Sequence, residues 1–189
     1  MPFGSLWLPV LVSAALVWIA SAIVWMALPH HKSDFSKLPS EDGVTDALRK
    51  LALKPGQYIL PYMADMKECK DPAVIKRWND GPIVMFRVRP NGMPKMGPNL
   101  TAYFIYCFVV SFVTAYVARH TLNYGESAHR VFRLTGTIAI ASYTLALIPE
   151  SIWMWRPWSA TWKSVCDSIV YGIITGAVFM WLWPHALMG

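Results

Sequence analysis

Long apolar stretches alternate with polar ones along this chain, and four of the apolar stretches have the length of a membrane crossing. The first covers residues 5–28 and contains no charged side chain. The other three cover residues 100–118, 134–153 and 165–183. An α-helix rises about 1.5 Å per residue, so roughly 20 apolar residues span the hydrocarbon core of a bilayer. The pattern therefore predicts four transmembrane helices.

The first stretch has a second interpretation, because Ala20-Ser21-Ala22 resembles the cleavage site of a secretory signal peptide. A signal peptide has basic residues before an apolar core of about 7–15 residues. No Lys or Arg precedes this stretch, and it is longer than such a core. We therefore expect an anchor that is not cleaved.

Residues 29–98 are polar, and their pattern predicts a small α+β module outside the membrane. Ser40 followed by two acidic residues is typical of a helix N-terminus, and Lys54-Pro55-Gly56 ends that helix. A second short helix begins after Asp71. Strands are predicted at residues 57–60 and 83–89. A module of this size buries little apolar surface by itself. We therefore expect it to pack on the membrane helices or on a partner.

Together these elements predict an all-α integral membrane four-helix bundle, with the α+β module between its first two helices. Composition agrees, because only 15% of the residues are charged, whereas a soluble domain has about 25%. The net charge of +6 raises the question of nucleic acid. Most basic residues lie in the polar module among acidic ones, which favours a solvated surface near anionic lipid. We predict no nucleic-acid partner.

The distribution of basic residues also predicts the orientation of the chain. Cytoplasmic loops of membrane proteins are enriched in Lys and Arg. Most of the 17 basic residues lie between Lys32 and Lys95, and Arg156 and Lys163 precede the last apolar stretch. We therefore expect a multi-pass protein of the cell membrane with the module in the cytoplasm and both termini outside.

Glu150 and Asp167 are the candidate functional residues, because an ionisable side chain at membrane depth is costly and often functional. They lie near the facing ends of the last two apolar stretches, so we expect them at a similar depth. One interpretation is a proton-relay or ion-binding pair, completed by the histidines after the first stretch. The alternative is structural: the carboxylates pair with Arg156 and Lys163, or Asp167 lies at a helix N-terminus.

The histidines argue against a bound cofactor. Haem between membrane helices needs an axial ligand, usually histidine, well inside a span, and none of the five histidines lies in the middle of a predicted span. His30 and His31 are the residues to consider for a metal site. Adjacent histidines on a helix point about 100° apart, however, so they make a poor pair of ligands. We predict no cofactor and no metal centre.

Small residues recur at helical spacing in the last three apolar stretches. Gly172 and Gly176 form a Gly-x-x-x-Gly motif, and Ser111 and Ala115 have the same spacing. The third stretch carries a matching series at Thr135, Ala139, Ser142 and Ala146. Such faces let helix backbones approach closely in lipid. They predict a compact bundle, with contacts within the chain or with a membrane-protein partner or second copy.

Five tryptophans are expected near one membrane face, because they lie at the ends of predicted spans that meet there: Trp25, Trp153, Trp155, Trp158 and Trp162. Indole rings concentrate at the membrane–water interface. The simplest interpretation is an aromatic belt in contact with the lipid bilayer. The alternative is a surface that packs against a lipid headgroup, a quinone or a partner subunit.

No common catalytic motif, such as Gly-x-Ser-x-Gly, His-Glu-x-x-His or a P-loop, is present in the sequence. Two hypotheses about function remain. The first is a non-catalytic accessory, assembly or scaffolding subunit of a membrane complex, which the small size and the uncharged middle of each span favour. The second is a small membrane enzyme or transporter with a carboxylate site near Glu150 and Asp167, under the tryptophan-rich face. The sequence favours the first.

Overall fold

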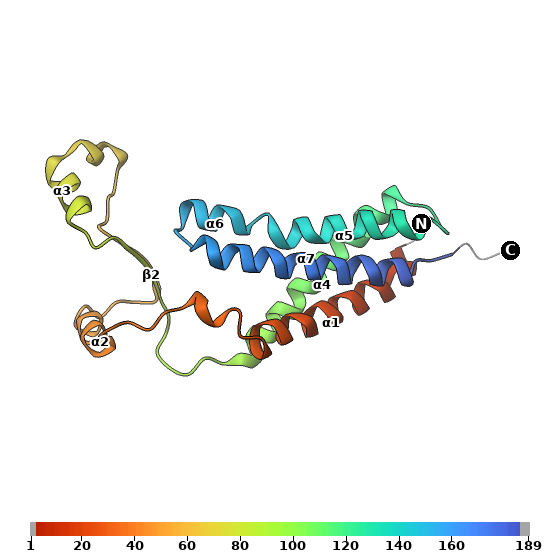
Figure 1. The fold of residues 1–189 in the computed structure, drawn as a ribbon, viewed down its shortest axis with the longest axis horizontal. Helices are drawn as coiled ribbons and strands as arrows, with labels where there is room; N and C mark the ends of the chain where they lie inside the picture. Colours follow the sequence, from red (N-terminus) through yellow and green to blue (C-terminus); the bar gives the residue numbers. More distant parts are fainter. Residues whose placement is uncertain (1–2, 186–189) are drawn as a thin grey trace. The chain divides into compact units, whose positions relative to one another are not determined.

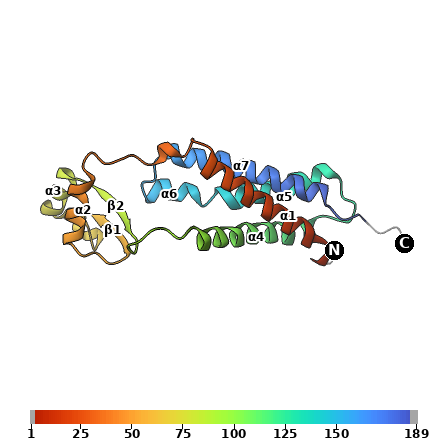
Figure 2. The same cartoon turned by 90° about the horizontal axis from the view of Figure 1, so that it is seen from below.

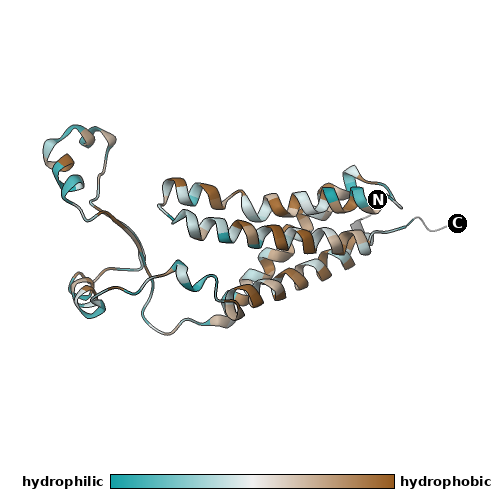
Figure 3. Cartoon of the chain, viewed as in Figure 1, coloured by the Kyte–Doolittle hydropathy of each residue, from teal (hydrophilic) through white to brown (hydrophobic). Residues whose placement is uncertain are grey.

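Four helical segments that are long and apolar enough to cross a membrane dominate the computed structural model, which describes residues 3–185 (Figures 1 and 2). Hydrophobic residues cover most of their length (Figure 3). In the described part of the chain the segments are Gly4–Ala27, Met96–Thr121, Ala128–Trp153 and Trp158–Trp181. The prediction of a mostly helical chain with four helices long and apolar enough to cross a membrane is therefore confirmed.

The first span consists of three consecutive helical segments. A 3-10 turn, η1 (Phe3–Leu6), leads into α1 (Trp7–Ala22), and a π-helical turn, η2 (Ile23–Ala27), follows. α1 packs against α4 (Met96–Thr121) and α7 (Trp158–Trp181). Where α1 meets α4, the Ser13 hydroxyl donates a hydrogen bond of 3.0 Å to the Ser111 hydroxyl. Ser111 and Ala115 are both fully buried, so this face of α4 lies inside the bundle.

α5 (Ala128–Thr144) and α7 lie side by side along most of their length (Figures 1 and 2). A Cβ atom added at Gly172 would lie 3.1 Å from the carbonyl oxygen of Gly136. One added at Gly176 would lie 3.2 Å from the Cα of Gly136. These distances are tighter than ordinary van der Waals contacts, so the helices meet backbone to backbone because both positions are glycine. The Gly-x-x-x-Gly face is therefore occupied within the chain.

The third span is not the continuous helix over residues 134–153 that the sequence predicts. α5 begins earlier, so His129 lies in its first turn rather than in a loop. The helix is interrupted after Thr144, and α6 (Leu147–Trp153) follows. Pro149 is the third residue of α6, where its missing N–H has no intrahelical acceptor to lose. Because of this interruption, Ala146 is exposed and does not belong to the predicted small-residue face. The buried side of α5 includes Thr135 and Ala139, as predicted, and also Gly136 and Tyr143.

The second and fourth spans are longer than the predicted 100–118 and 165–183. α4 begins at Met96 and includes Pro98 in its first turn, where proline is compatible with a helix. α7 begins at Trp158, directly after Pro157, so Lys163 and Asp167 are both helical. Hydropathy detects the apolar part of a helix, whereas its ends depend on backbone conformation and capping. This explains why the predicted ends are too short.

Residues Ser36–Pro94 form a second compact unit. It contains α2 (Glu41–Lys50), β1 (Gly56–Leu60), a 3-10 turn η4 (Met66–Lys70), α3 (Pro72–Asp80) and β2 (Val84–Val88). The strands pair antiparallel, with Gly56 opposite Val88 and Leu60 opposite Val84. Val74 is buried, but most apolar side chains of the unit are partly or fully exposed. The predicted order of helix, strand, helix and strand is present, with little core.

Candidate functional site

The chain turns sharply after the first span, and this turn positions two histidines. η2 ends at Ala27 and Leu28 is extended, so the helix does not continue to the histidines. His30 and His31 lie in a turn before η3 (Lys32–Asp34), in which the Asp34 N–H donates to the His31 carbonyl oxygen. The centroids of the two imidazole rings are only 4.1 Å apart. The expectation that these rings diverge by 100° is therefore wrong, because it assumed a continuous helix.

Asp167 of α7 lies between the two imidazoles. Its Oδ1 is 3.2 Å from His30 Nε2, and its Oδ2 is 2.7 Å from His31 Nε2. Among the described residues these three form a group whose candidate ligand atoms all lie within 4.8 Å of one another. Asp167 and His31 are buried, and His30 is partly exposed. We call these three residues the His–Asp cluster.

Asp34 contacts His31 on the side of the ring opposite to Asp167. Its carboxylate lies 2.6 Å from His31 Nδ1 and accepts a hydrogen bond of 2.6 Å from Lys163 Nζ. Lys163 also donates to the hydroxyl of Ser33. Burial acts to raise the pKa of Asp34, but the hydrogen bonds from Lys163 and His31 outweigh it, so the pKa is lowered. Asp34 is therefore an ionised acceptor that fixes the His31 ring.

Both ring nitrogens of His31 face a carboxylate, which limits its chemical state. A neutral imidazole carries one N–H, so its other nitrogen would direct a lone pair at a carboxylate oxygen. Two arrangements remove that conflict when both carboxylates are ionised. Either His31 is an imidazolium between Asp34 and Asp167, or Nδ1–H donates to Asp34 while Nε2 and Asp167 share a cation. Trp25 stacks on the His31 ring at 3.8 Å with an interplanar angle of 4°.

The residues of the cluster fit a transition-metal ion. Two histidines and one carboxylate are a common ligand set for first-row metals, and three protein ligands leave coordination positions open. Ligands about 2.0–2.2 Å from a metal lie roughly 3.0–3.5 Å from one another. The 3.2 Å between His30 and Asp167 is in that range, whereas the 2.7 Å between His31 and Asp167 is shorter and must lengthen when a metal binds. A metal-bound histidine usually donates its second N–H to a carboxylate. Asp34 stands in that position relative to His31.

A cavity of about 340 Å³ adjoins the cluster at Asp167. Aromatic side chains dominate its wall, and a polar edge lies on α7 and the preceding loop. Its lining consists of Trp25, Tyr103, Tyr106, Tyr143, Leu147, Arg156, Ser164, Asp167, Ser168 and Tyr171. The site therefore combines a buried carboxylate with an aromatic cavity inside the bundle.

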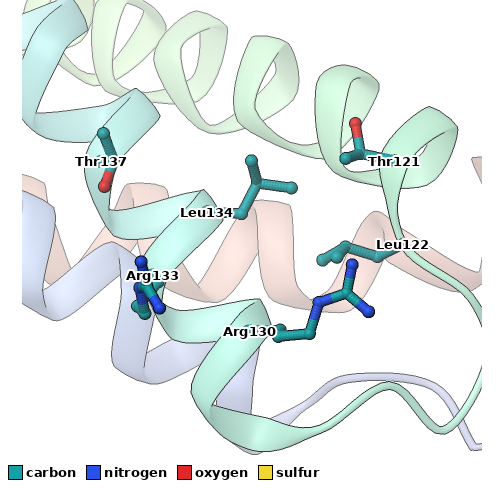
Figure 4. Close-up of a pocket in the computed structure, with 6 residues that line it drawn as sticks. All are labelled: Thr121, Leu122, Arg130, Arg133, Leu134 and Thr137. Carbon is teal, nitrogen blue, oxygen red and sulfur yellow. The ribbon is translucent and has the colours of Figure 1, made fainter.

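A second pocket lies at the other end of α5, where Arg130 and Arg133 accompany the end of α4 (Figure 4). Arg130 pairs with Glu126 at 3.1 Å. The remaining lining residues are Thr121, Leu122, Leu134 and Thr137. The lining offers no carboxylate, cysteine or histidine, so this pocket is not a candidate centre for acid–base or metal chemistry.

Of the two carboxylates that the sequence links, only Asp167 belongs to the cluster. Asp167 belongs to the His–Asp cluster, whereas Glu150 lies in the first turn of α6 and is not a member. Lys163 pairs with Asp34, and Arg156 donates to the Ser164 hydroxyl at 2.7 Å. The expected pairing of Asp167 with these cations is therefore wrong. Its placement at a helix N-terminus is wrong too, because α7 begins about 14 Å earlier along the axis at roughly 1.5 Å per residue.

The tryptophans of the predicted belt are all substantially exposed on the outside of the helical unit: Trp25, Trp153, Trp155, Trp158 and Trp162. Trp158 and Trp162 stack on each other with centroids 6.2 Å apart. Trp25 differs from the others because it contacts the His–Asp cluster and lines the cavity. It thus joins the exposed aromatic surface to the candidate site.

Sequence reasoning missed Asp34 and the tyrosines of the cavity. His31 and Asp34 are three residues apart, a spacing that brings side chains together in a helical turn. Tyr103 and Tyr106 have the same spacing on α4. These short-range signals were available, but the long-range contacts with α5 and α7 were not.

Comparisons with protein families, with curated proteins and with solved structures find no match for this chain. The functional conclusion therefore rests on the geometry of the site. The interpretation as an accessory, assembly or scaffolding subunit stays a prediction.

Proposed function

We propose that this chain is a membrane protein that binds a divalent first-row transition-metal ion through His30, His31 and Asp167. The observation that carries the proposal is the convergence of two Nε2 atoms on the two oxygens of one buried carboxylate. Asp34 holds the far side of the His31 ring. The proposal develops the second hypothesis from the sequence, with Asp167 rather than Glu150 at the centre.

The alternative is a structural ion-pair network without a metal. In that network Asp34 and Asp167 balance an imidazolium at His31 and the ammonium of Lys163. In that network His30, whose ring lies 4.1 Å from that of His31, must be a neutral imidazole whose Nε2–H donates to Asp167 at 3.2 Å. Two imidazolium charges about 4 Å apart would repel by about 4 kcal/mol at an effective dielectric constant of 20. A metal ion uses both imidazoles in their neutral form.

The number of protein ligands supports an exchangeable or reactive site rather than a structural one. Structural zinc sites have four protein ligands, whereas catalytic sites leave a position for water or substrate. Asp167 also lines the aromatic cavity, so a molecule in that cavity lies next to a metal ligand. We place the activity of the protein, as an enzyme or a metal carrier, at this junction.

We also place the cluster on the cytoplasmic side of the membrane. In sequence, the two chain segments that hold it are next to residues 36–94 and to the last loop, which together carry most of the basic residues. The positive-inside rule supports this orientation, with both termini outside.

Metal binding is tested by equilibrium dialysis of the purified, EDTA-stripped protein against Zn²⁺, followed by elemental analysis. Wild-type protein should bind about one equivalent. Replacing a ligand in His30→Ala, His31→Ala or Asp167→Asn should abolish binding at the same free Zn²⁺. Asp34→Asn should keep the ligands but weaken binding roughly 10–100-fold, as expected for a residue that orients a metal-bound histidine.

Glu150→Gln is the matched control, because it also neutralises a carboxylate near this end of the bundle but lies outside the cluster. It should bind Zn²⁺ like wild type. Circular dichroism and gel filtration check that each variant is folded. If wild type and Asp167→Asn take up equal Zn²⁺, the cluster is a structural network and the proposal is wrong.

A further inference from the structure

The cavity beside Asp167 has a charged wall along one face of α7. Ser164 and Asp167 line the cavity three residues apart, a spacing that places side chains next to each other on a helix. Arg156, in the loop before α7, also lines it. Its Nη2 donates to the Ser164 hydroxyl at 2.7 Å and to the Ala160 carbonyl oxygen at 3.4 Å. The guanidinium therefore lies along the same face of α7 as Asp167, about one helical turn away.

Arg156 contributes a positive charge that the structure does not balance. Both acceptors of its Nη2 are neutral oxygen atoms, and within residues 3–185 no carboxylate forms an ion pair with it. Asp167, in contrast, contacts both histidines of the cluster. A guanidinium stays ionised in proteins, and a charge at membrane depth is costly unless it is paired. A ligand with a negative group would supply the charge that Arg156 lacks.

The proposed metal site adds a second positive centre to this wall. A divalent ion bound by one carboxylate and two neutral imidazoles keeps a positive charge, and its three protein ligands leave coordination positions open. Carboxylate oxygens are ordinary ligands of such ions, and a carboxylate is also the planar partner that a guanidinium binds best. One carboxylate can therefore bind the metal ion through one oxygen and accept from Arg156 through the other.

The rest of the cavity wall is apolar and extends to the outside of the helices. Besides Leu147 it consists of the rings of Trp25, Tyr103, Tyr106, Tyr143 and Tyr171. Tyr106 is 41% exposed and Trp25 is 50% exposed, and both belong to segments apolar enough to cross a membrane. A molecule dissolved in lipid can therefore reach the cavity. Its volume of about 340 Å³ is at the small end of ligand pockets, which suits one hydrocarbon chain rather than two.

We propose that the cavity binds a single-chain amphipathic carboxylate, of the fatty-acid class, with its carboxylate between Arg156 and the metal ion at Asp167. The hydrocarbon chain lies against the aromatic wall. The inference names the class of molecule that occupies the open coordination position. It rests on the proposed function for the metal ion, whereas Arg156 and the aromatic wall are independent of that ion.

Binding of tritiated palmitate to the full chain in nanodiscs tests the proposal, with empty nanodiscs as the blank for partition into lipid. At a fixed free Zn²⁺, wild type should bind palmitate saturably. Arg156→Gln removes the charge but keeps a hydrogen-bonding side chain, so it should weaken binding about 10–100-fold, the effect of losing a charged hydrogen bond. Arg156→Lys keeps the charge and should recover part of the affinity. The matched control is Arg130→Gln, outside this cavity, which should bind like wild type.

Competition with unlabelled lipids tests the class of ligand. Unlabelled palmitate should displace the bound label, and hexadecanol, which has the same chain without the charge, should displace it far less. Equal displacement by hexadecanol would overturn the proposal, because the cavity would then recognise only the chain. Stronger displacement by a single-chain lysophosphatidate than by palmitate would also overturn it, because the site would then prefer a phosphate.

Replacing Zn²⁺ with EDTA separates this inference from the proposed function, which Zn²⁺ dialysis without palmitate decides. EDTA should weaken palmitate binding to wild type but should leave binding to Asp167→Asn unchanged, because that variant holds no metal ion. If Zn²⁺ binds and palmitate binds equally to wild type and Arg156→Gln, the inference is wrong and the metal site stands. If palmitate binding depends on Arg156 but is the same in Zn²⁺ and in EDTA, the carboxylate does not reach a metal ion, and the inference is wrong.

Discussion

The contact between α5 and α7 makes a quantitative prediction for Gly172→Ala. The new Cβ would overlap Ile140 Cγ1 and would lie 3.0 Å from the Ile140 amide nitrogen and 3.1 Å from the Gly136 carbonyl oxygen. The Ile140 side chain can rotate away, but the two backbone atoms move only if the helices separate by a few tenths of an ångström. The substitution therefore disturbs a helix contact and not a single side chain.

The size of the effect follows from two opposing contributions. Overpacking a close contact costs about 1–3 kcal/mol, and the greater helix propensity of alanine returns up to about 1 kcal/mol. A net loss of about 1–2 kcal/mol corresponds to a fall in Tm of roughly 2–8 °C for a chain of this size. Gly176→Ala should behave similarly, because its Cβ would lie 3.1 Å from the Phe132 carbonyl oxygen.

Thermal unfolding followed by circular dichroism in a mild detergent measures this effect. Gly97→Ala is the control, since an added Cβ there meets nothing within 4 Å. Its Tm should stay close to that of wild type. The reasoning is refuted if Gly172→Ala unfolds at the same temperature as Gly97→Ala. It is also refuted if Gly172→Ala changes only the oligomeric state, because the glycine face would then serve a partner.

Two further predictions concern the Asp34 network and the orientation of the chain. Lys163→Met leaves the buried Asp34 without the ammonium group that pairs with it, and should lower the free energy of unfolding by about 1.5–3 kcal/mol. The control Lys76→Met breaks an exposed pair and should change it by less than about 0.5 kcal/mol. Equal losses in the two variants would show that Lys163 is as well solvated as Lys76. In a variant without the other two cysteines, the exposed Cys69 should react with a membrane-impermeant maleimide only after the cells are permeabilised. Labelling of intact cells would place the polar unit outside.

Much of the helical framework could be predicted from the sequence, because a helix that can span a membrane has a long run of apolar residues. The ends of the spans could not, since they depend on local backbone conformation. Pro98 and Pro149 illustrate the difficulty. Proline usually predicts that a helix is interrupted, yet each of these prolines lies in the first turn of a helix. His129 lies before the predicted third span and is nevertheless helical, because charged residues can occupy the first turns of a long helix.

The candidate site was only partly predictable. Asp167 stands out as a carboxylate in an apolar stretch, and the histidines were considered beside it. Their geometry depends on the π-helical turn Ile23–Ala27 and the extended Leu28, which hydropathy does not report. The role of Asp34 depends on Lys163, far away in sequence. Contacts of this kind arise from tertiary packing and have no local signature.

X-ray absorption spectroscopy of the Zn²⁺-loaded protein at the zinc K-edge tests the central claim most directly, because it reports the ligands of the bound ion. The account predicts a first shell of nitrogen and oxygen at about 2.0–2.2 Å, with outer-shell scattering from two imidazole rings. The Asp167→Asn variant should lack that spectrum at the same free Zn²⁺. A sulfur shell near 2.3 Å would instead place the ion at a cysteine. That result, or a shell without imidazole scattering, would contradict a metal site at His30, His31 and Asp167.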